Sequence, residues 1–181
     1  IAHAGILILL VGHVLTTTLV DRTDPSNFVT LERDVPTQHQ GMELVFTGVE
    51  VLSADEQGYG YRIGDGYVGV VIEARDVGGS LLGTITPGML RFDSPSGMVS
   101  ARSEVDRLTG ATGDTIVILD LLQSNELLSS MILGQTDDVS EVRVTVHHLQ
   151  GSHLVWAGWL MVVTGSALAS LPRRVTEPSQ D

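Results

Sequence analysis

The chain has two long apolar stretches without a charged side chain, residues 1–20 and residues 153–172. As an α-helix, about 20 residues with a rise of roughly 1.5 Å each span about 30 Å, which is the thickness of the hydrocarbon core of a bilayer. We therefore predict a transmembrane helix at each end of the chain. Pro25 follows the first stretch, and we expect that the helix ends before this proline.

Between these stretches, the hydrophobic and polar positions alternate with the period of two that is typical of β-strands. Residues 126–133 fit a short helix and a strand equally well. Short strands that are separated by glycine turns predict an all-β domain over residues 21–152, either a small, OB-like barrel or a sandwich. The stretches that read as strands are residues 41–51, 67–74, 81–85, 89–92, 114–122 and 139–148.

Three small residues within the second apolar stretch, Gly158, Gly165 and Ala169, allow another helix to approach closely. The spacing of Gly165 and Ala169 places these two residues on one face, as in many close-packed membrane helices. We therefore expect that this helix has a helical neighbour.

Aromatic and basic residues give this second helix an expected orientation. Trp156 and Trp159 lie near its start, where indole rings favour the headgroup level of a membrane. Arg173 and Arg174 follow its end, and basic residues favour the cytoplasmic side. We therefore predict a cell-membrane protein in which the β-domain is extracytoplasmic and residues 173–181 form a cytoplasmic tail.

The charge of the chain lies almost entirely between the two apolar stretches. Residues 21–152 contain 20 acidic residues and 8 arginines, a net charge of −12, and the chain contains no lysine. This acidic surface argues against nucleic-acid binding, which needs a basic footprint. The same composition suits a protein that stays soluble in concentrated salt, although a codon bias toward arginine explains the missing lysine equally well.

Two further absences limit the chemistry. The chain contains no cysteine, which excludes disulfides, thiolate nucleophiles and cysteine-ligated metals. It also lacks the Gly-x-Ser-x-Gly motif of the nucleophile elbow. The sequence therefore predicts no catalytic residue.

Histidines are the best candidates for functional residues in the apolar stretches. His3 and His13 lie within the first stretch, and a polar ring in hydrocarbon is costly unless it finds a partner. His13 lies about 80° around the helix from His3, and we expect it to be an ordinary interfacial residue. His147, His148 and His153 precede and open the second stretch; neighbours on a strand point to opposite faces, so His147 and His148 cannot both bind one metal from the same face.

Four features follow one another in the order of a known family. The first stretch opens with Ala2-His3-Ala4-Gly5, residues 41–50 contain the aromatic-x-Gly motif Phe46-Thr47-Gly48, residues 143–148 run directly into the second stretch, and that stretch carries Gly158, Leu160-Met161 and Gly165. Together these features resemble the C-terminal part of the cytochrome c biogenesis protein CcmF. That protein is a membrane subunit of the haem lyase, which attaches haem to apocytochrome c.

The resemblance implies that His3 is an axial ligand of the iron of a membrane-embedded b-type haem, whose second histidine ligand lies outside this chain. A neutral imidazole is a good iron ligand. The small side chains of Ala2, Ala4 and Gly5 would admit the flat haem, and Leu7, Leu10 and Val14 share roughly the same helix face as His3.

The resemblance also implies the partners: the other cytochrome c maturation subunits or the rest of a split CcmF, apocytochrome c, haem and membrane lipid. Such a chain would not form the thioether bond alone, and it would be a fragment or one piece of a split protein. The alternative is a protein of a different class: a two-span membrane anchor whose β-domain scaffolds another membrane complex and binds no haem.

Overall fold

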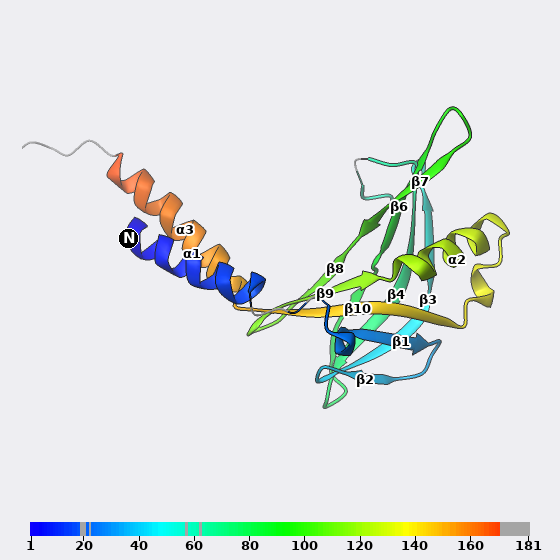
Figure 1. Ribbon diagram of the computed structural model, residues 1–181, viewed down its shortest axis with the longest axis horizontal. Coiled ribbons are helices and arrows are strands. Elements are labelled where there is room, and N and C mark those ends of the chain that lie inside the picture. The colour runs from blue at the N-terminus through cyan, green and yellow to red at the C-terminus, as the bar shows by residue number, and fades with distance from the viewer. Residues whose placement is uncertain (19–20, 22, 57, 62, 171–181) are drawn as a thin grey trace, which may run out of the picture. The chain divides into compact units, whose positions relative to one another are not determined.

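The computed structural model describes residues 1–170 except 19, 20, 22, 57 and 62 (Figure 1). The chain forms two compact units. The helical unit comprises Ile1–Val20 and Leu149–Asp181, and the β unit comprises Asp21–His148.

The β unit contains two antiparallel sheets, and this confirms the expectation of a mostly β domain. A four-stranded sheet has the order β1-β10-β9-β8, and a six-stranded sheet has the order β2-β3-β4-β6-β7, with β5 paired to β4. The strands are β1 (Phe28–Glu32), β2 (Thr37–His39), β3 (Met42–Ser53), β4 (Gly66–Asp76), β5 (Leu81–Ile85), β6 (Gly88–Asp93), β7 (Val99–Glu104), β8 (Asp106–Thr109), β9 (Gly113–Leu119) and β10 (Glu141–Gln150).

Two connections join the sheets and curl them into a half-barrel. β7 and β8 are separated only by Val105, so the chain passes directly from one sheet to the other. At the other side, Arg33 forms a parallel bridge with Phe46 and so links the end of β1 to β3. The register of β3 against β4 shifts between Phe46 and Gly48, and such a bulge bends a strand.

The hydrophobic core draws on both sheets and on the helix α2 (Leu121–Ile132). The alternation along β10 places Val142, Val144 and Val146 fully in this core, as the sequence pattern predicts. Full burial of each such side chain contributes roughly 1.5–3 kcal/mol to the free energy of unfolding. The other fully buried large side chains include Leu31, Leu44, Phe46, Ile72, Leu119 and Leu127.

One strand prediction is wrong at its end. The stretch 114–122 was expected to be a single buried strand, but β9 ends at Leu119. The Asp120 carboxylate accepts a hydrogen bond from the backbone N–H of Leu122 at 2.9 Å, and the Asp120 carbonyl accepts one from Ser124 N–H at 2.9 Å. Asp120 therefore caps α2, and most of the ambiguous stretch 126–133 lies in this helix.

The helical unit consists of α1 (Ala2–Thr17) and α3 (Ser152–Ala169). The residues at which the two predicted helices were expected to end, Val20 and Pro172, lie outside the described residues. So does the predicted tail, residues 173–181. Among the helices that the structure describes, α3 is long and apolar enough to cross a membrane, whereas α1 is apolar but shorter, with 16 residues. Membrane-crossing potential by length and composition is thus found for one of the two expected helices.

Candidate functional site on the helical hairpin

Glycines bring the backbones of α1 and α3 into direct contact. A Cβ atom built on Gly5 would lie 2.8 Å from the carbonyl oxygen of Gly158, and one built on Gly158 would lie 2.4 Å from the backbone nitrogen of Leu9. A Cβ on Gly12 would lie 2.6 Å from the backbone nitrogen of Val155. Real Cβ atoms do not approach other atoms so closely, so no side chain fits at these points.

The glycines recur every seven residues on both helices, at Gly5 and Gly12 of α1 and at Gly158 and Gly165 of α3. Seven residues are close to two helical turns, so each pair lies on one face. Gly165 meets Ala2, and Ala169 is exposed. The predicted small-residue contact is therefore found at Gly165 but not at Ala169.

Most of the large apolar side chains of the hairpin consequently point outward, while Leu9, Leu15 and Met161 are half-buried. Within the described residues of the hairpin, the buried residues are Gly5, Gly12, Ser152, Gly158 and Gly165. This arrangement is the reverse of a water-soluble helix pair, in which large apolar side chains fill the interface. The exposed apolar side chains are Ile6, Leu7, Leu10, Val11, Val14, Leu154, Trp156, Trp159, Leu160, Val163 and Leu168.

His3 lies on this outward surface of α1. Its side chain is exposed, and so are those of Leu7, Leu10 and Val14, which follow it at helical spacing. Gly5 lies on the opposite face, against α3. The His3 imidazole therefore faces away from the other helix of the hairpin.

The position of His3 and its small neighbours on α1 determines whether a haem could fit beside them. The spaces beside Ala2 and Gly5 are filled by α3, so Ala4 alone of the three small neighbours borders open surface. The exposed imidazole of His3 could hold an iron. Any further residue that held the group would have to come from outside the hairpin.

His13 occupies a different environment near the end of α1. It is exposed, and its carbonyl oxygen accepts hydrogen bonds from the hydroxyls of Thr16 at 3.2 Å and Thr17 at 2.6 Å. The Thr16 hydroxyl also donates to the carbonyl of Gly12 at 3.0 Å. These bonds satisfy carbonyls of the last helical turn, which a helix end leaves without backbone partners.

The other histidines do not assemble a metal site in the described part of the chain. His147 is buried, whereas the His148 ring lies 3.1 Å through Nδ1 from the Thr115 hydroxyl and 3.4 Å through Nε2 from that of Thr112. His153 belongs to α3 in the helical unit. No group of three or more His, Asp or Glu side chains among the described residues is placed to hold a metal ion.

A pocket of about 310 Å³ in the β unit was not predicted from the sequence. Its lining mixes apolar and hydrogen-bonding residues from several strands and turns. Gln40 lies in the turn before β3 and has a positive φ of 48°. The sequence of this turn does not indicate which distant residues Gln40 contacts. The lining residues are Gln40, Met42, Leu82, Leu108, Thr109, Gly110, Thr112, Gly113, Thr115 and His148.

The three tyrosines of the chain also gather in the β unit. The ring of Tyr61 stacks on that of Tyr67, with 4.9 Å between centroids, and meets the edge of Tyr59 at 5.5 Å. Burial raises the pKa of the Tyr67 phenol, which therefore stays neutral and donates to the carbonyl of Thr86.

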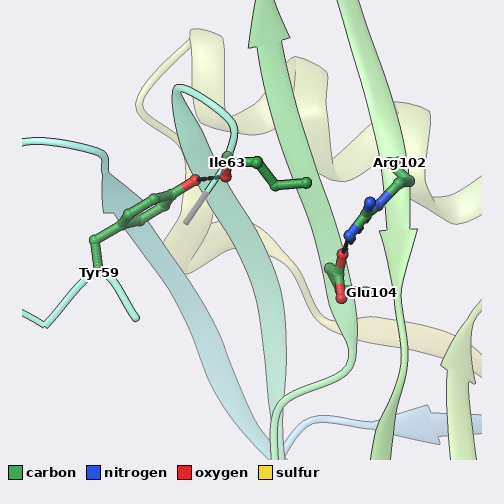
Figure 2. A network of polar contacts seen from close by, with 4 residues as sticks. All are labelled: Tyr59, Ile63, Arg102 and Glu104. Carbon is green, nitrogen blue, oxygen red and sulfur yellow. Dashed lines mark hydrogen bonds and ion pairs between the residues drawn. The ribbon is translucent and has the colours of Figure 1, made fainter. Parts of the chain in front are cut away.

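Contacts around the tyrosines indicate a packing role. The Tyr59 hydroxyl donates to the carbonyl of Ile63 at 2.8 Å. Figure 2 shows this bond and, separately, the ion pair of Arg102 and Glu104. The Tyr67 ring covers Gly69 so closely that a Cβ atom there would overlap it. An aromatic ring over a strand glycine restores the packing that glycine lacks.

Comparisons with known proteins add no assignment: no family model, no curated protein and no solved structure matches this chain. The case for a function therefore depends on the residues themselves.

Proposed function

We propose that this chain is the C-terminal portion of a CcmF-like subunit of the cytochrome c haem lyase system. In this proposal it helps to bind a membrane b-type haem and to position haem and apocytochrome c for covalent attachment. The observation that carries the proposal is the packing of the helical hairpin, which has glycines inside, large apolar side chains outside, and His3 on the outward surface.

A bilayer is the environment that this hairpin suits. Exposing the outward apolar surface to water would cost about 25 cal/mol of free energy for each Å². In lipid the same surface is solvated, and helices associate by close packing of small residues. At 1.5 Å per residue, the 16 residues of α1 reach about 24 Å and the 18 of α3 about 27 Å. A slightly thinned bilayer accommodates spans of this length.

The proposed orientation follows from the charges. Arg173 and Arg174 come directly after the second apolar stretch, and basic residues favour the cytoplasmic side. The strongly acidic β unit then lies outside the cytoplasm, where it would meet apocytochrome c and the other maturation subunits.

His3 supplies one side of the proposed haem site. Its exposed imidazole, bordered by Leu7 and Ala4, is open to a partner helix that carries the second histidine. A bound b-type haem supplies one-electron chemistry within the membrane. The hairpin would hold and orient it, and the surrounding leucines would exclude water from it.

The test is the visible absorption of the complex purified with its partner subunits. His3→Ala should abolish or shift the b-type haem bands, while His13→Ala, a change of the same kind on the same helix, should leave them intact. Equal amounts of both variants in the complex exclude a simple loss of assembly. A full b-type spectrum in His3→Ala would contradict the role of His3 as a haem ligand. It would favour the alternative in which this chain is a two-span scaffold that itself binds no haem.

A further inference from the structure

The pocket of about 310 Å³ in the β unit lies beside two edge strands. β8 is the last strand of the four-stranded sheet, and β5 pairs, within the described residues, with β4 alone. A Cβ atom on Gly83 of β5 would lie 3.0 Å from the Leu108 side chain of β8, so side chains close the seam between the sheets here. An edge strand keeps backbone N–H and C=O groups without a strand partner. Leu82 of β5 and Thr109 of β8 line the pocket.

Part of the pocket lining is aliphatic. It comprises Met42, Leu82 and Leu108, and Leu108 lies opposite Thr115 of β9 in the register of the two strands. The lining contains no Asp, Glu, Lys or Arg, although residues 21–152 carry a net charge of −12. It also contains no Phe, Tyr or Trp on which a flat ring could stack. The pocket therefore suits an uncharged ligand that carries an aliphatic group.

Another part of the lining consists of hydroxyls that hold the His148 ring. The Thr115 hydroxyl lies 3.1 Å from Nδ1 of this ring, and the Thr112 hydroxyl lies 3.4 Å from Nε2. A neutral imidazole has one N–H and one acceptor nitrogen, so one hydroxyl accepts from the ring and the other donates to it. The hydroxyl that accepts keeps its own hydrogen, which it can donate to a ligand.

Gln40 supplies a matching acceptor. Its side-chain amide donates to the Asn27 side-chain oxygen at 3.0 Å and to the carbonyl of Val146 at 3.3 Å. Because both of its N–H bonds are engaged, the amide is held in place and its carbonyl oxygen is left to accept from a ligand. The pocket thus combines an aliphatic wall with one O–H donor and one carbonyl acceptor.

We propose that this pocket binds a leucine-sized side chain of an extended polypeptide together with its flanking peptide groups. Peptide groups present carbonyl acceptors and N–H donors, which match the threonine hydroxyl and the Gln40 oxygen. Strand edges bind extended peptides through main-chain hydrogen bonds, and adjoining pockets select the side chains. A volume of about 310 Å³ holds about ten waters at about 30 Å³ each, which is enough for one such residue. The inference does not depend on the proposed haem.

Met42 provides a reporter inside the pocket. We would isotope-label the methionine methyl groups of the full chain, keep the chain in detergent, and titrate it with the peptide acetyl-GSGLGSG-amide. The Met42 methyl resonance, assigned through Met42→Leu, should shift saturably. The resonance of Met98, which is 71% exposed on the β6–β7 turn, should not move. Glycine in place of the peptide's leucine should weaken binding by about tenfold or more.

A hydroxyl deletion tests the polar part of the pocket. Thr115→Val keeps the shape of the side chain and should weaken binding of the leucine peptide severalfold. The Met89 methyl, which is buried in the core, should keep its resonance and so show that the variant folds. Thr30→Val, the same change at an exposed position on the far strand of this sheet, is the matched control and should bind as the wild type does.

Three outcomes would overturn the inference. One is a Met42 resonance that does not move with the leucine peptide. Another is an equal affinity for the leucine and glycine peptides, or of wild type and Thr115→Val for the leucine peptide. The third is binding of N-acetylleucinamide without binding of the peptide, which would indicate a site for small amides and not for a polypeptide.

Discussion

Gly5 of α1 and Gly158 of α3 lie back to back, so that a Cβ atom on Gly5 would come within 2.8 Å of the Gly158 carbonyl oxygen. Helices that pack through ordinary side chains keep their axes about 8–10 Å apart. The glycine pair lets the two backbones meet directly. It also fixes the rotation of each helix, and that rotation places His3 on the outward surface.

Gly158→Leu should therefore push the two helices apart by a few ångströms, because the new side chain has no space. Spin labels at Leu7→Cys and Leu160→Cys, both exposed positions, would report the separation by pulsed electron resonance. The matched control is Ala157→Leu, one residue away on the exposed surface, which should leave the distance unchanged. An identical distance distribution in both variants would show that the glycine contact does not set the helix spacing.

Sequence patterns predict those parts of the fold in which a side chain's own neighbours along the chain determine its place. The alternating valines of β10 are an example, since each one is buried where the period of two predicts. β7 was not predicted, because its sequence, VSARSE, has no apolar alternation and its residues are largely exposed. Its six residues are held instead by a complete ladder to β6.

Asp120→Ala should lower the free energy of unfolding of the β unit by about 0.5–2 kcal/mol, because it removes the cap of α2. The loss is measured by urea unfolding of the full chain, followed by far-UV circular dichroism. Asp120→Asn keeps a capping oxygen and loses only the charge partner of Arg143, 2.8 Å away, so it should cost less. Asp55→Ala, at an exposed loop position, serves as the neutral control. Equal losses in the alanine and asparagine variants would assign the effect to the charge instead.

Gly88→Ala should destabilise the β unit by about 1–3 kcal/mol or more, since overpacking forces neighbouring groups to move. A Cβ atom there would lie 2.1 Å from the Val68 carbonyl oxygen and 2.5 Å from the Cα of Gly69, and neither backbone atom can move freely. Thermal unfolding would measure the loss. Gly60→Ala is the matched control, because its nearest neighbouring atom is 4.0 Å away. Similar transition temperatures for the two variants would contradict the close packing at β4.

The candidate site was predictable only in part. His3 is a candidate from the sequence because it is a histidine in an uncharged stretch, but the sequence alone does not say which face of the helix it occupies. That depends on glycines seven residues apart on two helices that lie far apart in the chain. The pocket around Gln40 was not predictable for a similar reason, since Asn27 and Val146 are distant in sequence from the amide that joins them.

His39 should make the stability of the β unit sensitive to mild acid. Its Nε2 atom is buried and has no hydrogen-bond partner among the described residues, and burial lowers the pKa of the imidazole below its ordinary value of 6.5. Below that ordinary value the unfolded chain binds a proton that the folded one resists, so acidification favours unfolding. The unfolding free energy should thus be highest above about pH 7 and fall as the pH drops through 6.5 toward the lowered pKa. His39→Leu removes this titration. The urea midpoints of wild type and variant are measured from pH 8 to pH 5. The variant should become more stable relative to the wild type as the pH falls. A difference that stays constant over that range would show that His39 does not carry the effect.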